Sequence, residues 1–187
     1  MLRSLKKICL ILLVSFCLLV PFLSLAQDMD TPVVDGFTGE TTYSTTLWVI
    51  GQNQHEYLMA YFTRTKNDYH LKFRVDMLVD DHTYFTITKG DNVNIKLSNN
   101  DILTLKAANN TEAEKKLVRH GYYTLTYWSA YVDCALSDTD LDKLNSGTFT
   151  GVRIQSDNGN FDFGINTKEA YALIKMQAMI TGNKVNW

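Results

Sequence analysis

Alternation of apolar and polar residues is the dominant pattern along the chain. It is clearest at residues 69–79, where apolar or aromatic residues take every second position and polar residues lie between most of them. The same period recurs at residues 152–155 and 161–166, on either side of an Asn158-Gly159 pair that favours a tight hairpin turn. A period of two is that of a β-strand with one apolar and one polar face. The pattern therefore predicts an antiparallel sheet with one face in water.

Further runs of β-favouring residues bring the expected number of strands to about nine. The segment 109–118 is charged and lacks the alternation, so we expect a loop there with one or two helical turns. The strand at 122–134 is aromatic on both faces, which indicates a central position or a cover on each side. The remaining strands are expected at residues 42–50, 56–64, 84–88, 93–97 and 102–105, with turn-forming Gly, Asn and Asp between the short ones.

Residues 167–181 follow a helical period instead. Their apolar side chains recur every three to four residues on one side, which predicts an amphipathic helix that requires a sheet to lie against. Thr167 is the expected N-cap and Gly182 the expected end of this helix. A shorter helix is expected at 137–145, which opens with the residue types of a capping box. The predicted fold class is therefore α+β, a mostly antiparallel β-sandwich or curled sheet with the C-terminal helix packed on it.

The first 26 residues have the composition of a secretory signal peptide. Three basic residues precede an apolar stretch that ends at Pro21, and Ser24-Leu25-Ala26 forms a small-x-small cleavage site. The apolar stretch is short for a membrane span of about 20 residues, although an uncleaved N-terminal anchor is the alternative. We therefore expect an exported protein, periplasmic or secreted, with no membrane span in the mature chain. Its expected parts are a signal peptide at 1–26, an extended lead-in at 27–40 and a single β-rich domain at 41–187.

Charge and cysteine content narrow the possible partners. The chain has 18 Lys+Arg and 20 Asp+Glu, and removal of the signal peptide leaves 15 basic residues against 20 acidic ones. Nucleic-acid binding normally requires a basic surface that replaces phosphate counterions, so no nucleic-acid partner is expected. Cys134 is the one cysteine outside residues 1–26, and it is expected to be either a small buried apolar side chain, a nucleophile or a site of intermolecular pairing.

Two resemblances accompany these patterns. A sandwich closed by a C-terminal helix is similar to the pleckstrin-homology-like arrangement, a likeness of element order. The signal sequence and the Thr-, Asn- and Tyr-rich strands resemble small uncharacterised exported proteins of Bacteroidota, and VRIQSDNGNFDF at residues 152–163 is the most distinctive stretch. The resemblance implies an exported β-rich domain. It implies no activity and no catalytic residues.

Three groups of residues are candidates for binding or catalysis. Asp80, Asp81 and His82 follow a long strand, where they could bind a metal or polarise water or could form an ordinary turn. His70 and Arg74 belong to the polar row of the strand at 69–79, which could face a charged ligand or form cross-strand charge pairs. Outward aromatic side chains could stack on sugar rings or anchor a partner protein. The aromatic candidates are Tyr122, Tyr127, Trp128 and Tyr131.

The common catalytic and metal-binding motifs are incomplete or missing in the sequence. His55-Glu56 opens like a zinc-protease helix, but Met59 stands where the second histidine is required. A phosphate-binding loop, a G-x-S-x-G elbow and a Cys-x-x-Cys pair are absent from residues 27–187. We therefore expect no metal and no cofactor.

These observations favour an exported, non-catalytic binding or interaction module. Its expected ligand is a glycan, an envelope component or a partner protein. One alternative is an extracytoplasmic hydrolase that uses acidic and histidine residues near Asp80 and His82. Another is a purely structural component of an assembly.

Overall fold

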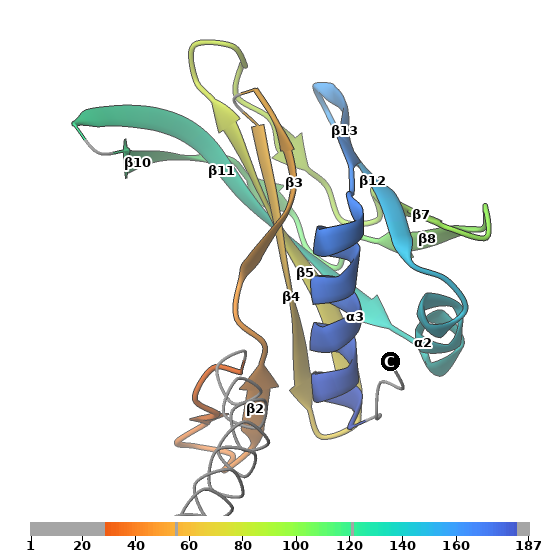
Figure 1. The fold of residues 1–187 in the computed structure, drawn as a ribbon. Coiled ribbons are helices and arrows are strands. Elements are labelled where there is room, and N and C mark those ends of the chain that lie inside the picture. Colours follow the sequence, from red (N-terminus) through yellow and green to blue (C-terminus); the bar gives the residue numbers. More distant parts are fainter. Residues whose placement is uncertain (1–28, 55, 121, 183–187) are drawn as a thin grey trace, which may run out of the picture.

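The computed structural model describes residues 29–54, 56–120 and 122–182 (Figure 1). The expected signal peptide at 1–26 lies outside the described residues, as does His55. The described part of the chain contains thirteen strands and two helices, arranged as two main antiparallel sheets and a short two-stranded one. The α+β class with a mostly antiparallel, curled sheet is confirmed, with more strands than the nine expected.

The larger sheet has seven strands in the order β1-β2-β4-β5-β11-β10, and β3 also pairs with β4. Strands β2 and β3 follow one another along the same edge of β4. The sheet curls strongly, and the hairpin of β10 and β11 projects beyond the rest of it (Figure 1). Its strands are β1 (Val33–Val34), β2 (Thr41–Ser44), β3 (Trp48–Asn53), β4 (Glu56–Thr65), β5 (Asp68–Leu78), β10 (Glu114–His120) and β11 (Tyr123–Leu136).

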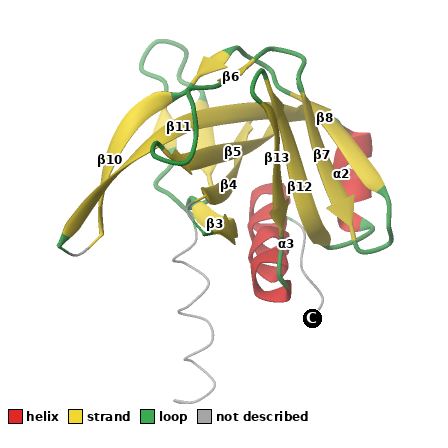
Figure 2. Cartoon of the chain, turned by 90° about the horizontal axis from the view of Figure 1, so that it is seen from above, coloured by secondary structure: helices red, strands yellow, loops and turns green. Residues whose placement is uncertain are grey.

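The smaller sheet has four strands in the order β13-β12-β7-β8. Gly159 takes a left-handed φ of 108° between β12 and β13, where the Asn-Gly pair predicts the hairpin turn. Figure 2 shows this sheet standing beside the larger one, with α3 at its lower end. The strands are β7 (Asn92–Leu97), β8 (Ile102–Lys106), β12 (Phe149–Ser156) and β13 (Gly159–Gly164), and the short sheet pairs β6 (Thr86–Ile87) with β9 (Thr111–Glu112).

The C-terminal helix α3 (Thr167–Thr181) has the bounds that its apolar period predicts. Its N-cap is Asn166, so the expectation of Thr167 at that position is wrong. The side chain of Asn166 accepts from the backbone N–H of Glu169, and the Glu169 carboxylate accepts from the backbone N–H of Asn166. Gly182 ends the helix in a left-handed conformation, as expected.

The core lies between the two sheets and under α3. Alternate residues of β5 point inward, and Phe73 and Val75 are fully buried with Ile95 of the smaller sheet. Helix α3 contacts β3, β4 and β12, and its Leu173 is fully buried in the same cluster. The helix therefore lies across the antiparallel sheet, as its apolar side requires. Helix α2 (Asp138–Asn145) follows β11 and is capped by Ser137.

Two local expectations are wrong. Residues 109–118 are not a helical loop, since they form β9 and most of β10, whose partner β11 lies beyond the next turn. Pairing of β10 with β11 and of β9 with β6 thus outweighs the poor local β-propensity of a charged segment. The single strand expected at 42–50 is broken at Thr45, which is buried. Its hydroxyl accepts from the backbone N–H of Phe62, so a side chain replaces part of the ladder.

Candidate functional site

The outer face of the seven-stranded sheet collects four of the predicted site residues. His70 and Arg74 lie on β5, and Tyr127 and Tyr131 lie on the neighbouring strand β11. Tyr131 is the direct partner of Arg74, and positions two apart on a strand share one face. We name this surface the tyrosine face. It comprises Tyr57, Tyr61, His70, Lys72, Arg74, Asp76, Tyr127, Ser129, Tyr131 and Asp133.

A buried ion pair lies at the centre of the tyrosine face. Nε of Arg74 donates to Oδ1 of Asp76 at 2.9 Å, and Nη2 donates to Oδ2 at 2.6 Å. The hydroxyl of Ser129 donates to the same Oδ1 from the next strand. Asp76 and Ser129 are both buried. Because a buried carboxylate is costly unless it is paired, this network holds the face in one arrangement.

A second carboxylate links the other basic residues of the face. Nζ of Lys72 lies 3.1 Å from Oδ2 of Asp133, and Nδ1 of His70 lies 2.7 Å from Oδ1. Since Asp133 belongs to β11 and the basic residues belong to β5, the charged row forms cross-strand pairs. This is one of the two roles expected for it.

Basic side chains and a second ring contact the tyrosine rings of this face. Nζ of Lys116 lies 4.6 Å from the ring centroid of Tyr131, and the guanidinium carbon of Arg74 lies 6.0 Å from it. Tyr131 remains exposed at the surface, whereas Tyr127 is buried and meets Tyr57 edge-on at 5.9 Å. Burial, with a smaller contribution from Tyr57, raises the pKa of Tyr127. A ligand can therefore reach the ring of Tyr131 but not that of Tyr127.

Trp128 lies on the opposite face of β11, away from the tyrosine face. Its indole N–H donates to the carbonyl of His82 at 3.1 Å, and its ring meets that of Tyr84 edge-on at 5.4 Å. His82 in turn places Nε2 at 2.9 Å from Oε1 of Glu56. The imidazole thus has a carboxylate neighbour, and that neighbour comes from β4 rather than from the preceding aspartates.

The other predicted residues lie apart from both groups. Asp80 and Asp81 are exposed in the turn after β5, and Tyr122 is exposed at the end of the β10–β11 hairpin. In the described part of the chain no three His, Cys, Asp or Glu side chains are grouped so that they could hold a metal ion. Cys134 is fully buried, and burial raises its pKa to about 12, so the thiol stays neutral at physiological pH.

A second polar surface, which the sequence did not single out, lies on the outer face of the four-stranded sheet. The register of its strands aligns the outward residues in rows, while Ile154 and Phe163 on the inward side are buried in the core. In the order β13, β12, β7, β8, two of these rows are Asp162-Arg153-Asn94-Thr104 and Gly164-Gly151-Lys96-Ile102.

The two glycines leave the backbone of this surface bare. Gly151 and Gly164 are direct partners, and no atom lies within 4 Å of the position that a Cβ of Gly164 would take. A depression of about 650 Å³ lies over them, and a second of about 720 Å³ shares Gly164 with it. We name the two together the polar trough. Its outward lining is Asn94, Lys96, Ile102, Thr104, Gly151, Arg153, Asp162 and Gly164 over the sheet, and Gln52, Asn53, Gln54, Thr150, Asn166 and Glu169 beyond it.

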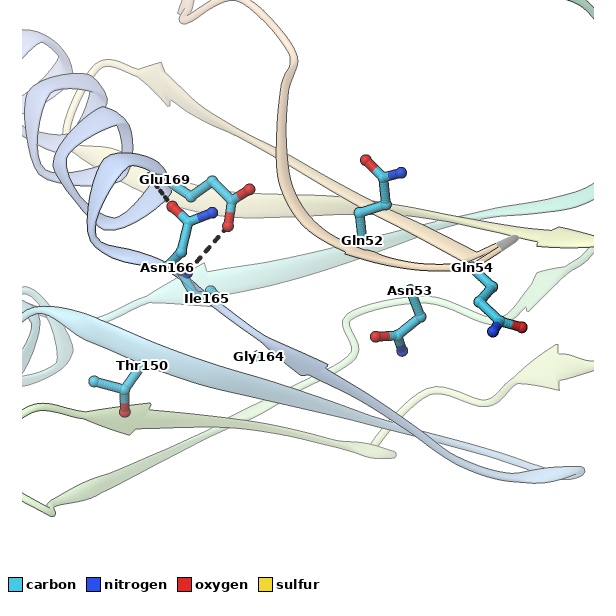
Figure 3. Close-up of a pocket in the computed structure, with 8 residues that line it drawn as sticks. All are labelled: Gln52, Asn53, Gln54, Thr150, Gly164, Ile165, Asn166 and Glu169. Carbon is cyan, nitrogen blue, oxygen red and sulfur yellow. Dashed lines mark hydrogen bonds between the residues drawn. The ribbon is translucent and has the colours of Figure 1, made fainter.

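Figure 3 shows the end of the polar trough beside α3. Asn53, at the end of β3, and Gln54, in the turn that follows, border it on one side, and Asn166 and Glu169 border it from the start of the helix. The amide of Asn53 donates to the carbonyl of Asp162 at 3.3 Å, which ties this turn to β13. Amide side chains from two separate segments thus border this end of the trough.

Over the sheet, the side chains of the trough are paired with one another. Arg153 donates from Nε and Nη2 to the two carboxylate oxygens of Asp162 at 2.6 and 2.8 Å. Hydrogen bonding to Arg153 lowers the pKa of Asp162, so this carboxylate stays charged at neutral pH. Thr104 donates to the side-chain oxygen of Asn94 at 2.8 Å. These polar side chains of the trough are therefore preorganised by one another.

The chain was compared with protein-family models, with curated proteins and with solved structures, and none of them matches it. Among the described helices, neither is both long enough and apolar enough to cross a bilayer.

Proposed function

We propose that the chain is an exported binding module that holds a glycan chain in the polar trough. The observation that carries the proposal is the strip of bare backbone at Gly151 and Gly164, enclosed by amide, hydroxyl and charged side chains. Ligand sites are usually concave and carry a few fixed polar groups that set orientation. The trough has both properties.

The chemistry of the lining suits a sugar. Sugar hydroxyls both donate and accept hydrogen bonds, and amide and hydroxyl side chains offer both functions. Gln54 and Thr150 supply them at one end of the trough, and Asn94 and Thr104 supply them at the other. A pyranose ring is flat on each side, so the bare backbone between these groups gives it a surface without steric obstruction.

Charge and apolar content favour a neutral glycan over a protein partner. The basic residues Lys96 and Arg153 are balanced by the acidic residues Asp162 and Glu169. Ile102 is the large apolar side chain that the described lining exposes. Protein interfaces normally have an apolar centre with exposed aromatic residues, whereas Phe163, the aromatic residue of the described lining, is buried.

The carboxylates of the trough support binding rather than hydrolysis. Glycosidases use two carboxyl groups, one of which has a raised pKa and acts as the acid. Here Asp162 is held by Arg153, which lowers its pKa instead. Glu169 accepts from the backbone N–H of Asn166 at 3.1 Å as part of the helix cap.

The test is to fill the trough without disturbing the fold. Gly164→Val adds a side chain where no atom lies within 4 Å, and valine suits a strand, so the variant is expected to fold normally. We expect a ligand identified on a glycan array to bind about tenfold or more weakly to this variant in calorimetry. Gly36→Val is the matched control. Its Cβ also enters open space, and Gly36 is not part of the trough lining.

Two results would contradict the proposal. The first is an array that stays blank at high protein concentration. The second is a glycan that binds Gly164→Val and the wild type equally but loses affinity for Tyr131→Ser. That outcome would move the binding site to the tyrosine face, where the aromatic residues of the sequence predict it.

A further inference from the structure

At the end of the β10–β11 hairpin, no third described strand pairs with the two. Strand β5 pairs with β11 from Tyr127 onward, so beyond that residue β10 and β11 form a two-stranded ribbon (Figures 1 and 2). We name its described residues, 117–120 and 122–126, the arm. Lys115 and Lys116 lie at its base, opposite Trp128 and Tyr127 of β11. An isolated two-stranded ribbon is only marginally stable in water. The arm is thus a segment that a binding partner would stabilise.

The arm exposes apolar side chains around its whole end. Leu117 is 76% exposed, Tyr122 is fully exposed at 101%, and Tyr123 is 76% exposed. Leu117 pairs with Thr126, and Tyr123 pairs with His120. Residues 117 and 120 are three apart on the same strand, so the two pairs lie on opposite faces of the ribbon. A flat protein surface would cover one face only. A fluid medium that surrounds the tip would cover both.

The arm and its base are also basic, in a chain with more acidic than basic residues. Lys115, Lys116 and Arg119 follow one another along β10, with Glu114 just before them. Lys116 and Arg119 lie roughly 10 Å apart at the rise of a strand, so the basic groups extend along β10 toward the apolar tip. Lysines on an edge strand also discourage pairing with a second copy of the sheet.

We propose that the arm docks on a lipid bilayer with anionic headgroups, with Leu117, Tyr122 and Tyr123 entering the interface below the phosphates. Tyrosine is enriched at that depth because its ring is apolar and its hydroxyl remains hydrated. The basic residues of β10 then meet the headgroups, where each contributes about fivefold to binding. This site is separate from the polar trough and goes beyond glycan binding.

The test uses protein purified after expression of the full sequence, and vesicles of phosphatidylcholine with or without phosphatidylglycerol. Sedimentation with vesicles is expected to show binding that requires phosphatidylglycerol and weakens with added salt. The triple variant Leu117→Ser, Tyr122→Ser, Tyr123→Ser is expected to bind about fivefold or more weakly. Lys115→Gln with Arg119→Gln, which removes two basic residues at about fivefold each, is expected to bind about 25-fold more weakly. Circular dichroism of each variant confirms that it is folded.

The matched control removes three exposed apolar side chains elsewhere, in Val33→Ser, Val34→Ser, Phe37→Ser. It is expected to bind vesicles as the wild type does. Equal binding by the arm variant and the wild type overturns the proposal, as does equal binding to neutral and anionic vesicles. Self-association that depends on the arm, without binding to vesicles, would also overturn it and would identify the occupant as a second copy.

Discussion

The outer faces of the two sheets contain the same ion pair in two different surroundings. Arg74 and Asp76 on the large sheet, and Arg153 and Asp162 on the small one, are each joined by two parallel hydrogen bonds between 2.6 and 2.9 Å. The side chains of the first pair are 18% and 6% exposed, and those of the second are 53% and 58% exposed. Geometry is shared, and solvent access differs.

This difference separates a closed surface from an open one. On the tyrosine face, bulky rings cover the ion pair, and its charges interact with neighbouring side chains. On the small sheet, Gly151 and Gly164 leave the adjoining positions empty, so the second pair borders a depression that a ligand can enter. The first pair is expected to contribute mainly to stability, and the second mainly to recognition.

Asp76→Ala is expected to have the largest effect on stability. It leaves the guanidinium of Arg74 and the hydroxyl of Ser129 without their acceptor in a buried place. Removing one partner of a buried ion pair typically destabilises a protein by about 3–5 kcal/mol. Chemical denaturation followed by circular dichroism measures this change. A loss below about 1 kcal/mol would show that water reaches the pair as freely as it reaches an exposed one.

Alkaline pH is expected to have the second-largest effect, a loss of stability of the large sheet. Burial raises the pKa of Tyr61, and it also raises the pKa of Tyr127. An unfolded tyrosine loses its proton near pH 10, so the contribution of both residues to stability is complete below about pH 10 and is lost as pH rises through the higher folded values. Each unit of difference corresponds to about 1.4 kcal/mol.

Phenolate absorbance, recorded together with circular dichroism during an alkaline titration, tests this expectation. The most buried tyrosines should ionise together with the loss of native β-structure. Tyr61→Phe should retain the fold, and it should reduce the phenolate absorbance that appears together with unfolding. If every tyrosine ionises near pH 10 while the protein stays folded, the tyrosine face is not closed to solvent.

Much of the fold was predictable because the strongest elements are locally consistent. The alternation at 69–79 and the helical period at 167–181 match β5 and α3 closely. The break at Thr45 was not predictable, since it depends on a hydrogen bond to Phe62 on another strand. The same holds for β10, where a charged sequence becomes a strand because β11 lies beside it.

The candidate sites were less predictable than the fold, because register decides which outward residues become neighbours. The sequence identified His70, Arg74, Tyr127 and Tyr131, but it did not show that they share one face. It passed over the polar trough, although Arg153 and Asp162 alternate with buried residues in the most distinctive stretch. The available signal was the pairing of Gly151 with Gly164 across the predicted hairpin.

The smallest expected effect on stability is that of Asp162→Ala. Because its ion pair with Arg153 is more than half exposed, water and salt already screen it, and the melting temperature is expected to fall by no more than about 3 °C. Added salt should reduce even this difference, whereas it should leave most of the loss in Asp76→Ala. Thermal unfolding of both variants at low and high salt measures the contrast. If Asp162→Ala were as damaging as Asp76→Ala, the pair on the small sheet would be a structural element, and the trough beside it would lose its main charged recognition group.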